Sequence, residues 1–143
     1  MGTRRNEGNA GYTLMELLVV LGIIALLVAL VAPQVLRYLG DARSGTARAQ
    51  IKNIESALEL YYLDTGTYPN SQTGLAALIK PPPDELNWKG PYMKQESGLL
   101  DPWKKPYIYS SPGKAAAYEV SSLGRDGQTG GTGEDADIVN GNK

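Results

Sequence analysis

Residues 11–32 read GYTLMELLVVLGIIALLVALVA, an apolar run whose only charged side chain is Glu16. The part from Tyr12 to Ala32 has 21 residues, and a helix of this length covers roughly 30 Å, the hydrocarbon thickness of a bilayer. A carboxylate inside a membrane costs on the order of 3 kcal/mol, so it is a candidate functional residue. The run therefore predicts a membrane-spanning helix with one functional carboxylate.

The flanks of the run predict its orientation and its processing. A polar leader, residues 1–11, carries Arg4 and Arg5, and basic flanks stay in the cytoplasm, so the rest of the chain should be exported. A secretory signal would have small residues at a cleavage site behind the apolar run, but residues 28–31 read VALV. The small residue lies on the near side of the run, at Gly11.

A helical pattern continues behind the anchor. Pro33 removes one helix hydrogen bond and should loosen the helix at that point. Further on, apolar residues recur at spacings of three and four, which predicts one buried stripe on an amphipathic stalk helix. The stripe consists of Ala47, Ile51, Ile54, Leu58 and Tyr61. We expect the helix to end near Leu63 or Asp64 and to stop at Gly66.

The segment behind the stalk predicts short elements. Residues 74–79 favour a short helix closed by three prolines, and residues 84–97 have the composition of a loop. Residues 106–110 and 117–122 are rich in aromatic and β-branched side chains and have turn residues between them, so they predict two antiparallel strands. The expected fold is α+β and pilin-like, with a long N-terminal membrane-spanning and stalk helix packed on a small antiparallel β-sheet.

The composition excludes several chemistries. The chain has no Cys and no His, so it has no disulfide, no thiol nucleophile and no Ser-His-Asp or Cys-His set, and any metal would take oxygen ligands. Its 14 basic and 15 acidic residues provide no basic field for nucleic acid. We therefore expect neither an enzyme nor a nucleic-acid partner. A glycosidase-like pair of Asp126 and Asp137 is the remaining catalytic alternative.

The residues at the start of the anchor resemble the type IV pilin and pseudopilin class. In that class a prepilin peptidase removes the leader after a glycine, which an aromatic residue, Thr, Leu and then a Glu follow. Here these positions hold Gly11, Tyr12, Thr13, Leu14 and Glu16. The resemblance implies cleavage after Gly11, methylation of the new N-terminus at Tyr12, and assembly through Glu16, which pairs with the N-terminal amine of a neighbouring subunit. The alternative is that Glu16 only favours the positive end of its own helix.

Most of the mature chain resembles the major pseudopilins of type II secretion. Three blocks carry this resemblance: TYP at residues 67–69, TGLAAL at residues 73–78 and DPWKKPY at residues 101–107. Members commonly have glycine where this chain has Lys104, which implies a backbone that tolerates a side chain and puts a positive φ there in doubt. The resemblance divides the chain into a leader (1–11), a transmembrane and assembly helix (12–33) and a periplasmic domain (34–143).

The same resemblance implies a structural subunit of a pseudopilus that polymerises through its N-terminal helix to drive export of folded proteins across the outer membrane. The chain would be held by the lipid of the inner membrane, with its N-terminus in the cytoplasm and its C-terminal domain in the periplasm. Its partners would be copies of itself, minor pseudopilins, the prepilin peptidase and the inner-membrane assembly platform. The alternative is a type IV pilin of a surface filament, which commonly has a C-terminal cysteine pair that this chain lacks.

The C-terminal segment, residues 122–138, has five glycines and four carboxylates in 17 residues. Calcium takes about six to eight oxygen ligands from a pliable loop, but the spacing here is not that of an EF-hand. Composition alone favours an acidic, solvated tail. The pseudopilin resemblance implies instead a loop that binds one Ca²⁺. Its ligands would be the side chains of Asp126 and Asp137 and the carbonyl of Leu123, with Glu134 or Asp135 as a less certain addition.

Overall fold

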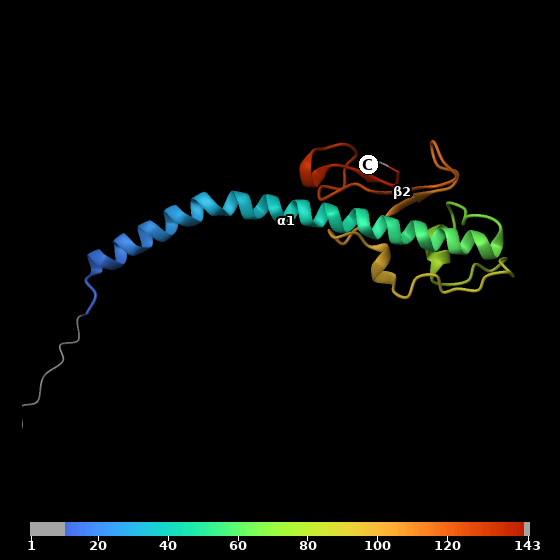
Figure 1. The fold of residues 1–143 in the computed structure, drawn as a ribbon, viewed down its shortest axis with the longest axis horizontal. Helices are drawn as coiled ribbons and strands as arrows, with labels where there is room; N and C mark the ends of the chain where they lie inside the picture. The colour runs from blue at the N-terminus through green and yellow to red at the C-terminus, as the bar shows by residue number, and fades with distance from the viewer. Residues whose placement is uncertain (1–10, 142–143) are drawn as a thin grey trace, which may run out of the picture. The chain divides into compact units, whose positions relative to one another are not determined.

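The computed structural model describes residues 11–141 and divides the chain into two compact units, Met1–Tyr38 and Leu39–Lys143. The order of elements along the chain can be followed in Figure 1 from the blue N-terminal helix to the red C-terminal segment. Residues 1–10 of the expected leader lie outside the described residues.

One long helix belongs to both units. α1 (Leu14–Thr65) runs through Pro33 without a break. It ends at Gly66, whose φ of 77° and hydrogen bond from its N–H to the carbonyl of Tyr62 (2.8 Å) are those of a left-handed helix cap. The predicted stop at Gly66 is therefore confirmed. The last helical residue, Thr65, lies one or two residues beyond the expected end at Leu63 or Asp64.

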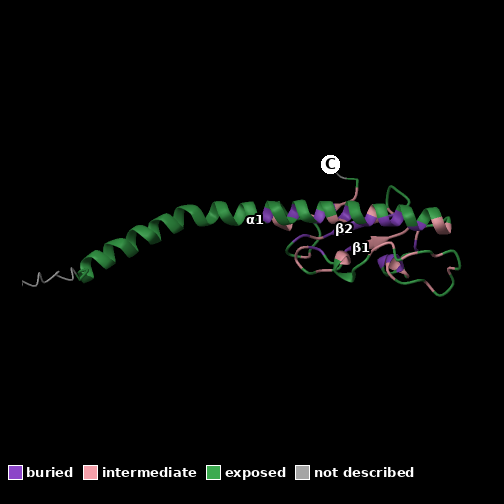
Figure 2. Cartoon of the chain, turned by 60° about the horizontal axis from the view of Figure 1, so that its bottom comes forward, coloured by how far each residue is buried: buried purple, intermediate pink, exposed green. Residues whose placement is uncertain are grey.

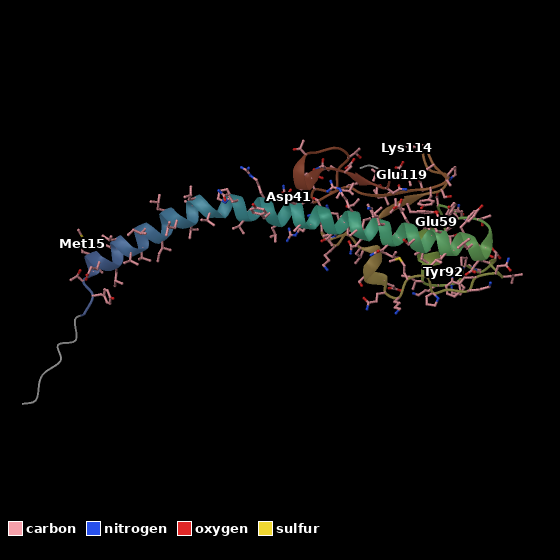
Figure 3. All side chains as sticks on the ribbon, viewed as in Figure 1. Met15, Asp41, Glu59, Tyr92, Lys114 and Glu119 are labelled. Atoms are coloured by element: carbon pink, nitrogen blue, oxygen red, sulfur yellow. The ribbon has the colours of Figure 1, made fainter. Side chains whose placement is uncertain are left out.

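In the first unit the side chains of α1 are exposed to whatever surrounds the helix. Figure 2 shows this part of α1 as exposed throughout, and Figure 3 shows its side chains, Met15 among them, projecting from the ribbon. By length and composition α1 can cross a membrane. The described residues leave the apolar surface of this part uncovered, and burial of such a surface away from water is favourable.

In the second unit one face of α1 is buried. All five predicted stripe residues are at most 3% exposed, and Figure 2 shows the buried residues along one side of the helix. They pack with residues from the rest of the unit into a single core, whose other buried members are Ala57, Leu75, Ala77, Leu78, Tyr107, Tyr118, Val120 and Ile138. The amphipathic interpretation of the stalk is confirmed, because the same periodicity that marks the stripe in the sequence marks the buried face.

The sheet has three antiparallel strands in the order β1-β2-β3: β1 (Ile108–Ser110), β2 (Glu119–Ser122) and β3 (Ile138–Val139). Tyr109 of β1 pairs with Val120 of β2, and Ser122 of β2 pairs with Ile138 of β3. The first two strands lie inside the predicted segments. β3 was not predicted, because two residues behind a glycine-rich segment carry no periodicity; the strand exists through its pairing with β2 and the burial of Ile138.

Three short 3₁₀ helices complete the second unit: η1 (Gly74–Leu78), η2 (Glu96–Leu99) and η3 (Gly133–Asp135). The short helix expected at residues 74–79 is thus a 3₁₀ helix. η2 begins at the end of the segment expected to be a loop. Such single turns are common connectors and leave little sequence signal.

The implication drawn from Lys104 is wrong, because its φ is +67°. The turn around it is held by Asp101, which is only 3% exposed. The Oδ1 of Asp101 accepts hydrogen bonds from the backbone N–H groups of Trp103 (3.0 Å) and Lys105 (2.9 Å), and its Oδ2 accepts one from the hydroxyl of Ser122 (2.6 Å). These bonds fix the turn, so the surrounding structure imposes the left-handed conformation on a lysine despite its cost.

Candidate functional site

The start of the anchor forms a capping box around Glu16. Thr13 precedes the first helical residue, and its backbone N–H (3.0 Å) and hydroxyl (3.3 Å) both donate to Oε2 of Glu16, while the N–H of Glu16 donates to the hydroxyl oxygen of Thr13 (3.2 Å). This reciprocal arrangement satisfies helix N-terminal donors. In the single chain Glu16 therefore binds its own helix end, the local role that had been the alternative to assembly.

The residues expected at the cleavage site lie in the open. Tyr12 is 79% exposed, and among the described residues no heavy atom beyond those of its chain neighbours lies within 4 Å of where a Cβ on Gly11 would be. The described residues therefore do not cover the bond between Gly11 and Tyr12. Thr13 was missing from the expected site residues, although the pattern Thr-x-x-Glu before an apolar run is a sequence signal for a capping box.

The C-terminal loop folds back on itself through backbone contacts. The N–H of Gly127 donates to the carbonyl of Leu123 (3.2 Å), and the N–H of Arg125 donates to the carbonyl of Glu134 (2.9 Å). Gly124 has a φ of +65°, and a Cβ there would lie 2.8 Å from the carbonyl oxygen of Glu134. Glycine is thus required where the two halves of the loop touch.

Glu134 joins this loop to α1. Its Oε1 accepts hydrogen bonds from the indole N–H of Trp103 (2.8 Å) and from the guanidinium of Arg43 (3.1 Å). The side chain of Glu134 is 15% exposed. The hydrogen bond from Trp103, aided by Arg43 and Arg125, holds the pKa of Glu134 below its ordinary value. The carboxylate is therefore a charged link between three segments of the second unit.

Asp135 is held by Arg125 in a two-pronged ion pair. Nε and Nη2 of Arg125 donate to Oδ1 (2.8 Å) and Oδ2 (2.9 Å) of Asp135. This contact lowers the pKa of Asp135 and raises that of Arg125. Arg43, Trp103 and Arg125 were not among the expected site residues. Arg125 stands beside Asp126 inside the loop, which was a weak local signal, whereas nothing local points to Arg43, 91 residues from Glu134.

The remaining expected calcium ligands differ in how far they are already bonded. Oδ1 of Asp137 is buried without a hydrogen-bond partner among the described residues, and its Oδ2 accepts from the N–H of Gly130 (2.9 Å). Oδ1 of Asp126 accepts from the N–H of Gln128 (2.9 Å), and a carbonyl such as that of Leu123 keeps a second lone pair.

These observations decide how well the loop fits a calcium ion. The described residues contain no group of three or more Asp and Glu side chains close enough to hold a metal. Of the expected ligands, Asp137 is the one whose buried oxygen lacks a described partner, and this oxygen is the feature of the loop that suits a cation. Glu134 and Asp135 fit poorly in this conformation, because arginines hold both.

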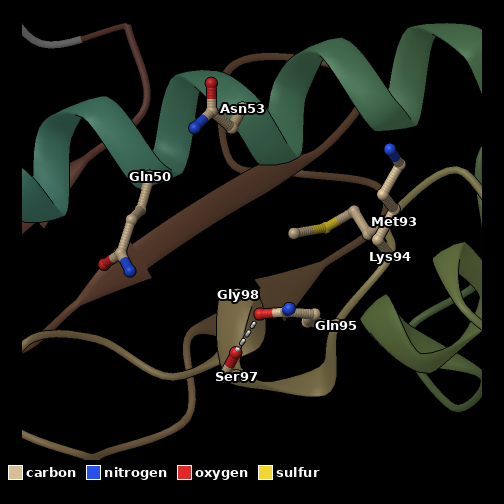
Figure 4. A pocket seen from close by; sticks show the side chains of 7 residues that line it. All are labelled: Gln50, Asn53, Met93, Lys94, Gln95, Ser97 and Gly98. Atoms are coloured by element: carbon tan, nitrogen blue, oxygen red, sulfur yellow. Dashed lines mark hydrogen bonds between the residues drawn. The ribbon is translucent and has the colours of Figure 1, made fainter.

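A cavity of about 410 Å³ lies beside α1 in the second unit. Figure 4 shows it between Gln50 and Asn53 of α1 and the segment around η2, where Ser97 donates to Gln95 (3.2 Å). Lys94 is the one titratable residue among those that line it. The described residues that line the cavity therefore include no carboxylate, and the hydroxyl of Ser97 is bonded to Gln95.

An N-terminal helix that is apolar in its first part and packed on a small antiparallel sheet in its second defines a pilin-like subunit. The family model described as "Prokaryotic N-terminal methylation motif" matches residues 8–32, and the one described as "Type II secretion system (T2SS), protein G" matches residues 34–141. The chain belongs to the type II secretion system protein G family.

Curated relatives and a solved structure agree with this assignment. The chain is 44% identical over 135 residues to "Type II secretion system core protein G" of Pseudomonas aeruginosa, covering 92% of this chain and 94% of the relative. It is 40% identical over 142 residues to the protein of the same name from Vibrio cholerae, with 97% and 96% covered. The crystal structure of the major pseudopilin from the type 2 secretion system of enterohaemorrhagic Escherichia coli matches with a TM-score of 0.60 at 31% identity, covering 70% of this chain and 87% of that one. These relatives support the pseudopilin interpretation over the type IV pilin alternative.

Proposed function

We propose that the chain is a structural subunit of a type II secretion pseudopilus and polymerises through the first part of α1. The observation that carries this proposal is the uncovered apolar surface of that part, where Leu26 is 72% and Leu30 is 70% exposed. Lipid covers such a surface before assembly, and neighbouring copies cover it in a filament. The role is mechanical, and growth of the filament drives export of folded proteins across the outer membrane.

The proposal includes the processing and location of the chain. A prepilin peptidase cleaves after Gly11 and the new N-terminus at Tyr12 is methylated; the methylation motif matched at residues 8–32 supports both steps. Before assembly the chain spans the inner membrane with its C-terminal unit in the periplasm. The inner-membrane assembly platform and minor pseudopilins are its further partners.

Glu16 changes partner on assembly. In the single chain its carboxylate caps its own helix, and in the filament it pairs with the N-terminal amine of a neighbour. The desolvation cost of a carboxylate and an ammonium in lipid is much lower when the two groups pair than when each is alone. The change of partner therefore favours stacked subunits over single ones.

Two substitutions separate capping from assembly. Glu16→Ala removes both the cap and the charge, whereas Glu16→Gln keeps the capping box, in which Gln replaces Glu well, and removes only the charge. We expect both variants to insert and to be cleaved after Gly11, and neither to form filaments by electron microscopy. Normal filaments from Glu16→Gln would show that capping is the whole role of Glu16.

The C-terminal loop is proposed to bind one Ca²⁺, with Asp137 as the central ligand and Leu123 and Asp126 as further ligands. Glu134 joins them only if Arg43 and Arg125 move away, and Asp135 joins them only if Arg125 moves away. The buried, unpartnered Oδ1 of Asp137 supports this proposal. Bound calcium would supply positive charge and oxygen coordination that order a segment rich in glycine.

Calorimetry on the full-length chain in detergent tests the calcium proposal. We expect the uptake of one Ca²⁺ and a lower melting temperature in EDTA, because an ion that binds only the folded form stabilises it by mass action. Asp137→Ala and Asp126→Ala should lose both effects, whereas Glu119→Ala on β2 should keep them. Absence of binding at millimolar calcium would favour the solvated acidic loop, and the pseudopilus proposal would stand.

A further inference from the structure

A groove of about 360 Å³ runs between α1 and the edge strand β3. Its apolar lining comes from Ile51, Ile138 and Val139, and its charged lining residues are Arg48, Lys52 and Glu55. Neither cation has an ion-pair partner within 4.0 Å in the part of the chain that the structure describes. The groove is therefore apolar inside, and two cations against one carboxylate give its lining a net positive charge.

An acidic knob stands elsewhere on the same unit. Leu86 is 95% exposed, the most exposed large apolar side chain among the described residues. The residues before it, Asp84 and Glu85, carry negative charges that no described cation pairs within 4.0 Å. The two nearby lysines are already engaged, since Lys80 pairs with Glu96 (2.8 Å) and Lys89 with Asp64 (3.5 Å).

The knob and the groove are complementary in character and in net charge. One apolar side chain beside two anions matches an apolar groove whose lining has a net positive charge, and such complementarity specifies a partner and its register. We propose that the Asp84–Leu86 knob of one copy docks into the Arg48–Val139 groove of the next copy. This inference rests on the proposed function, because it names the contact between periplasmic units in the filament.

The position of the two surfaces makes this a contact that propagates. The knob lies near Tyr61, which lines one cavity with Asp84 and Glu85, whereas the groove lies at Ile51, roughly 15 Å earlier along α1. Figure 1 shows the yellow-green segment with the knob near the end of α1 and the red C-terminal segment with β3 beside its middle. Because different surfaces meet, the contact is heterologous and adds copies in one direction without pairing them into closed dimers.

The contact is weak on its own. One leucine and two ion pairs bury far less than the ~1,000 Å² that a stable interface needs. The membrane anchor must therefore hold copies at a high effective concentration before the knob and groove engage. This accounts for assembly that is confined to anchored subunits, and the ion pairs at its rim should weaken as salt rises.

Cysteine cross-linking tests the contact, and the absence of native cysteine leaves the engineered pair as the only thiols. The full-length chain is expressed in a Gram-negative host in which the unmodified chain forms filaments. We expect oxidised Leu86→Cys/Val139→Cys to give a ladder of trimers and larger species, and each single variant to give dimers at most. Leu86→Cys/Lys114→Cys, whose second thiol lies in the turn between β1 and β2, should give no ladder. A chain that lacks residues 142–143 should give the same ladder as the full chain, and a ladder that appears only after this deletion would make that segment the occupant of the groove and overturn the contact between copies.

Charge reversal provides the second arm. Asp84→Lys/Glu85→Lys should lower the ladder yield at least tenfold, and adding Arg48→Glu/Lys52→Glu to the same chain should restore it. Filaments with no Leu86–Val139 ladder, or a ladder indifferent to charge reversal, would overturn this contact and leave the proposed function intact. Absence of filaments and of cross-links between copies of the anchor would instead contradict the proposed function.

Discussion

The two parts of α1 have the same backbone and opposite surroundings. In the first, apolar residues lie on every face of the helix and none of residues 11–39 is buried; in the second, one stripe is buried under η1 and the sheet, while the exposed faces mix charged residues with apolar ones such as Leu60 and Leu63. The first part thus lacks a packing partner among the described residues, whereas the second part has one. The helix therefore has two kinds of surface. Its second half packs into the core of the folded unit, and its first half is the surface that we propose for assembly.

The largest expected effect tests the second half. Leu58 is fully buried, so Leu58→Asp places an unpaired charge in the core and should cost more than about 4 kcal/mol, most of the stability of a domain at the lower end of the usual range of about 5–15 kcal/mol. Circular dichroism of the full-length chain in detergent should show a much lower melting temperature or no cooperative melt. Leu63→Asp, at a site that is 77% exposed on the same helix, serves as the control and should melt like the parent chain.

A Leu→Asp substitution in the first half should weaken membrane insertion and leave the folding of the second unit unchanged. Leu27 is 55% exposed, and Leu27→Asp should weaken insertion by about 3 kcal/mol while the second unit melts normally. Membrane fractionation and a melting curve on the same sample measure the two effects. A lowered melting temperature in Leu27→Asp would mean that the two halves of α1 are not independent in the way their surroundings suggest.

A smaller effect, an increase in the free energy of unfolding, is expected from a substitution in the turn at Asp101. Lys104→Gly removes a side chain from a left-handed position, φ +67°, and should stabilise the second unit by about 1 kcal/mol. Urea denaturation of the full-length chain would measure it. Unchanged or lower stability would mean that the flexibility of glycine in the unfolded chain offsets the relief.

The smallest expected effect concerns the link between α1 and the C-terminal loop. The pKa of Glu134 is lowered in the folded chain from an ordinary value of 4.5, so its contribution to stability is present above that value and is lost as the pH falls through the folded pKa. Between about pH 5 and about pH 3 the parent chain should therefore lose more stability than Glu134→Gln. If the free energy of unfolding changed equally with pH in the two chains, the contacts of Trp103 and Arg43 with Glu134 would not depend on its charge.

Much of the fold was predictable because its signals are local. The apolar run, the stripe from Ala47 to Tyr61 and the stop at Gly66 each depend on the spacing of neighbouring residues along one helix. The first two strands were found because aromatic and β-branched residues cluster there, while β3 was missed, since two residues cannot show a period.

The candidate sites divide in the same way. Gly11, Tyr12 and Glu16 stand in one short motif, so sequence alone nominates them, and their roles in processing and assembly stay predictions. Thr13-x-x-Glu16 was readable as a capping box, which the structure shows. The loop at residues 122–138 was located by its glycines and carboxylates, but the bonding state of each carboxylate was not, because Glu134 and Asp135 have charged partners whose positions depend on the fold.

The sequence by itself determined the apolar run, the amphipathic stalk and the family, because periodicity and short motifs depend on neighbours a few residues apart. Only the tertiary structure decided that Arg43 and Trp103 meet at Glu134, that Asp101 fixes Lys104 in a left-handed turn, and that Ile51 and Ile138 line one groove beside β3. These contacts join residues that are distant along the chain, and their geometry exists only after the helix, the sheet and the loops have packed into one core.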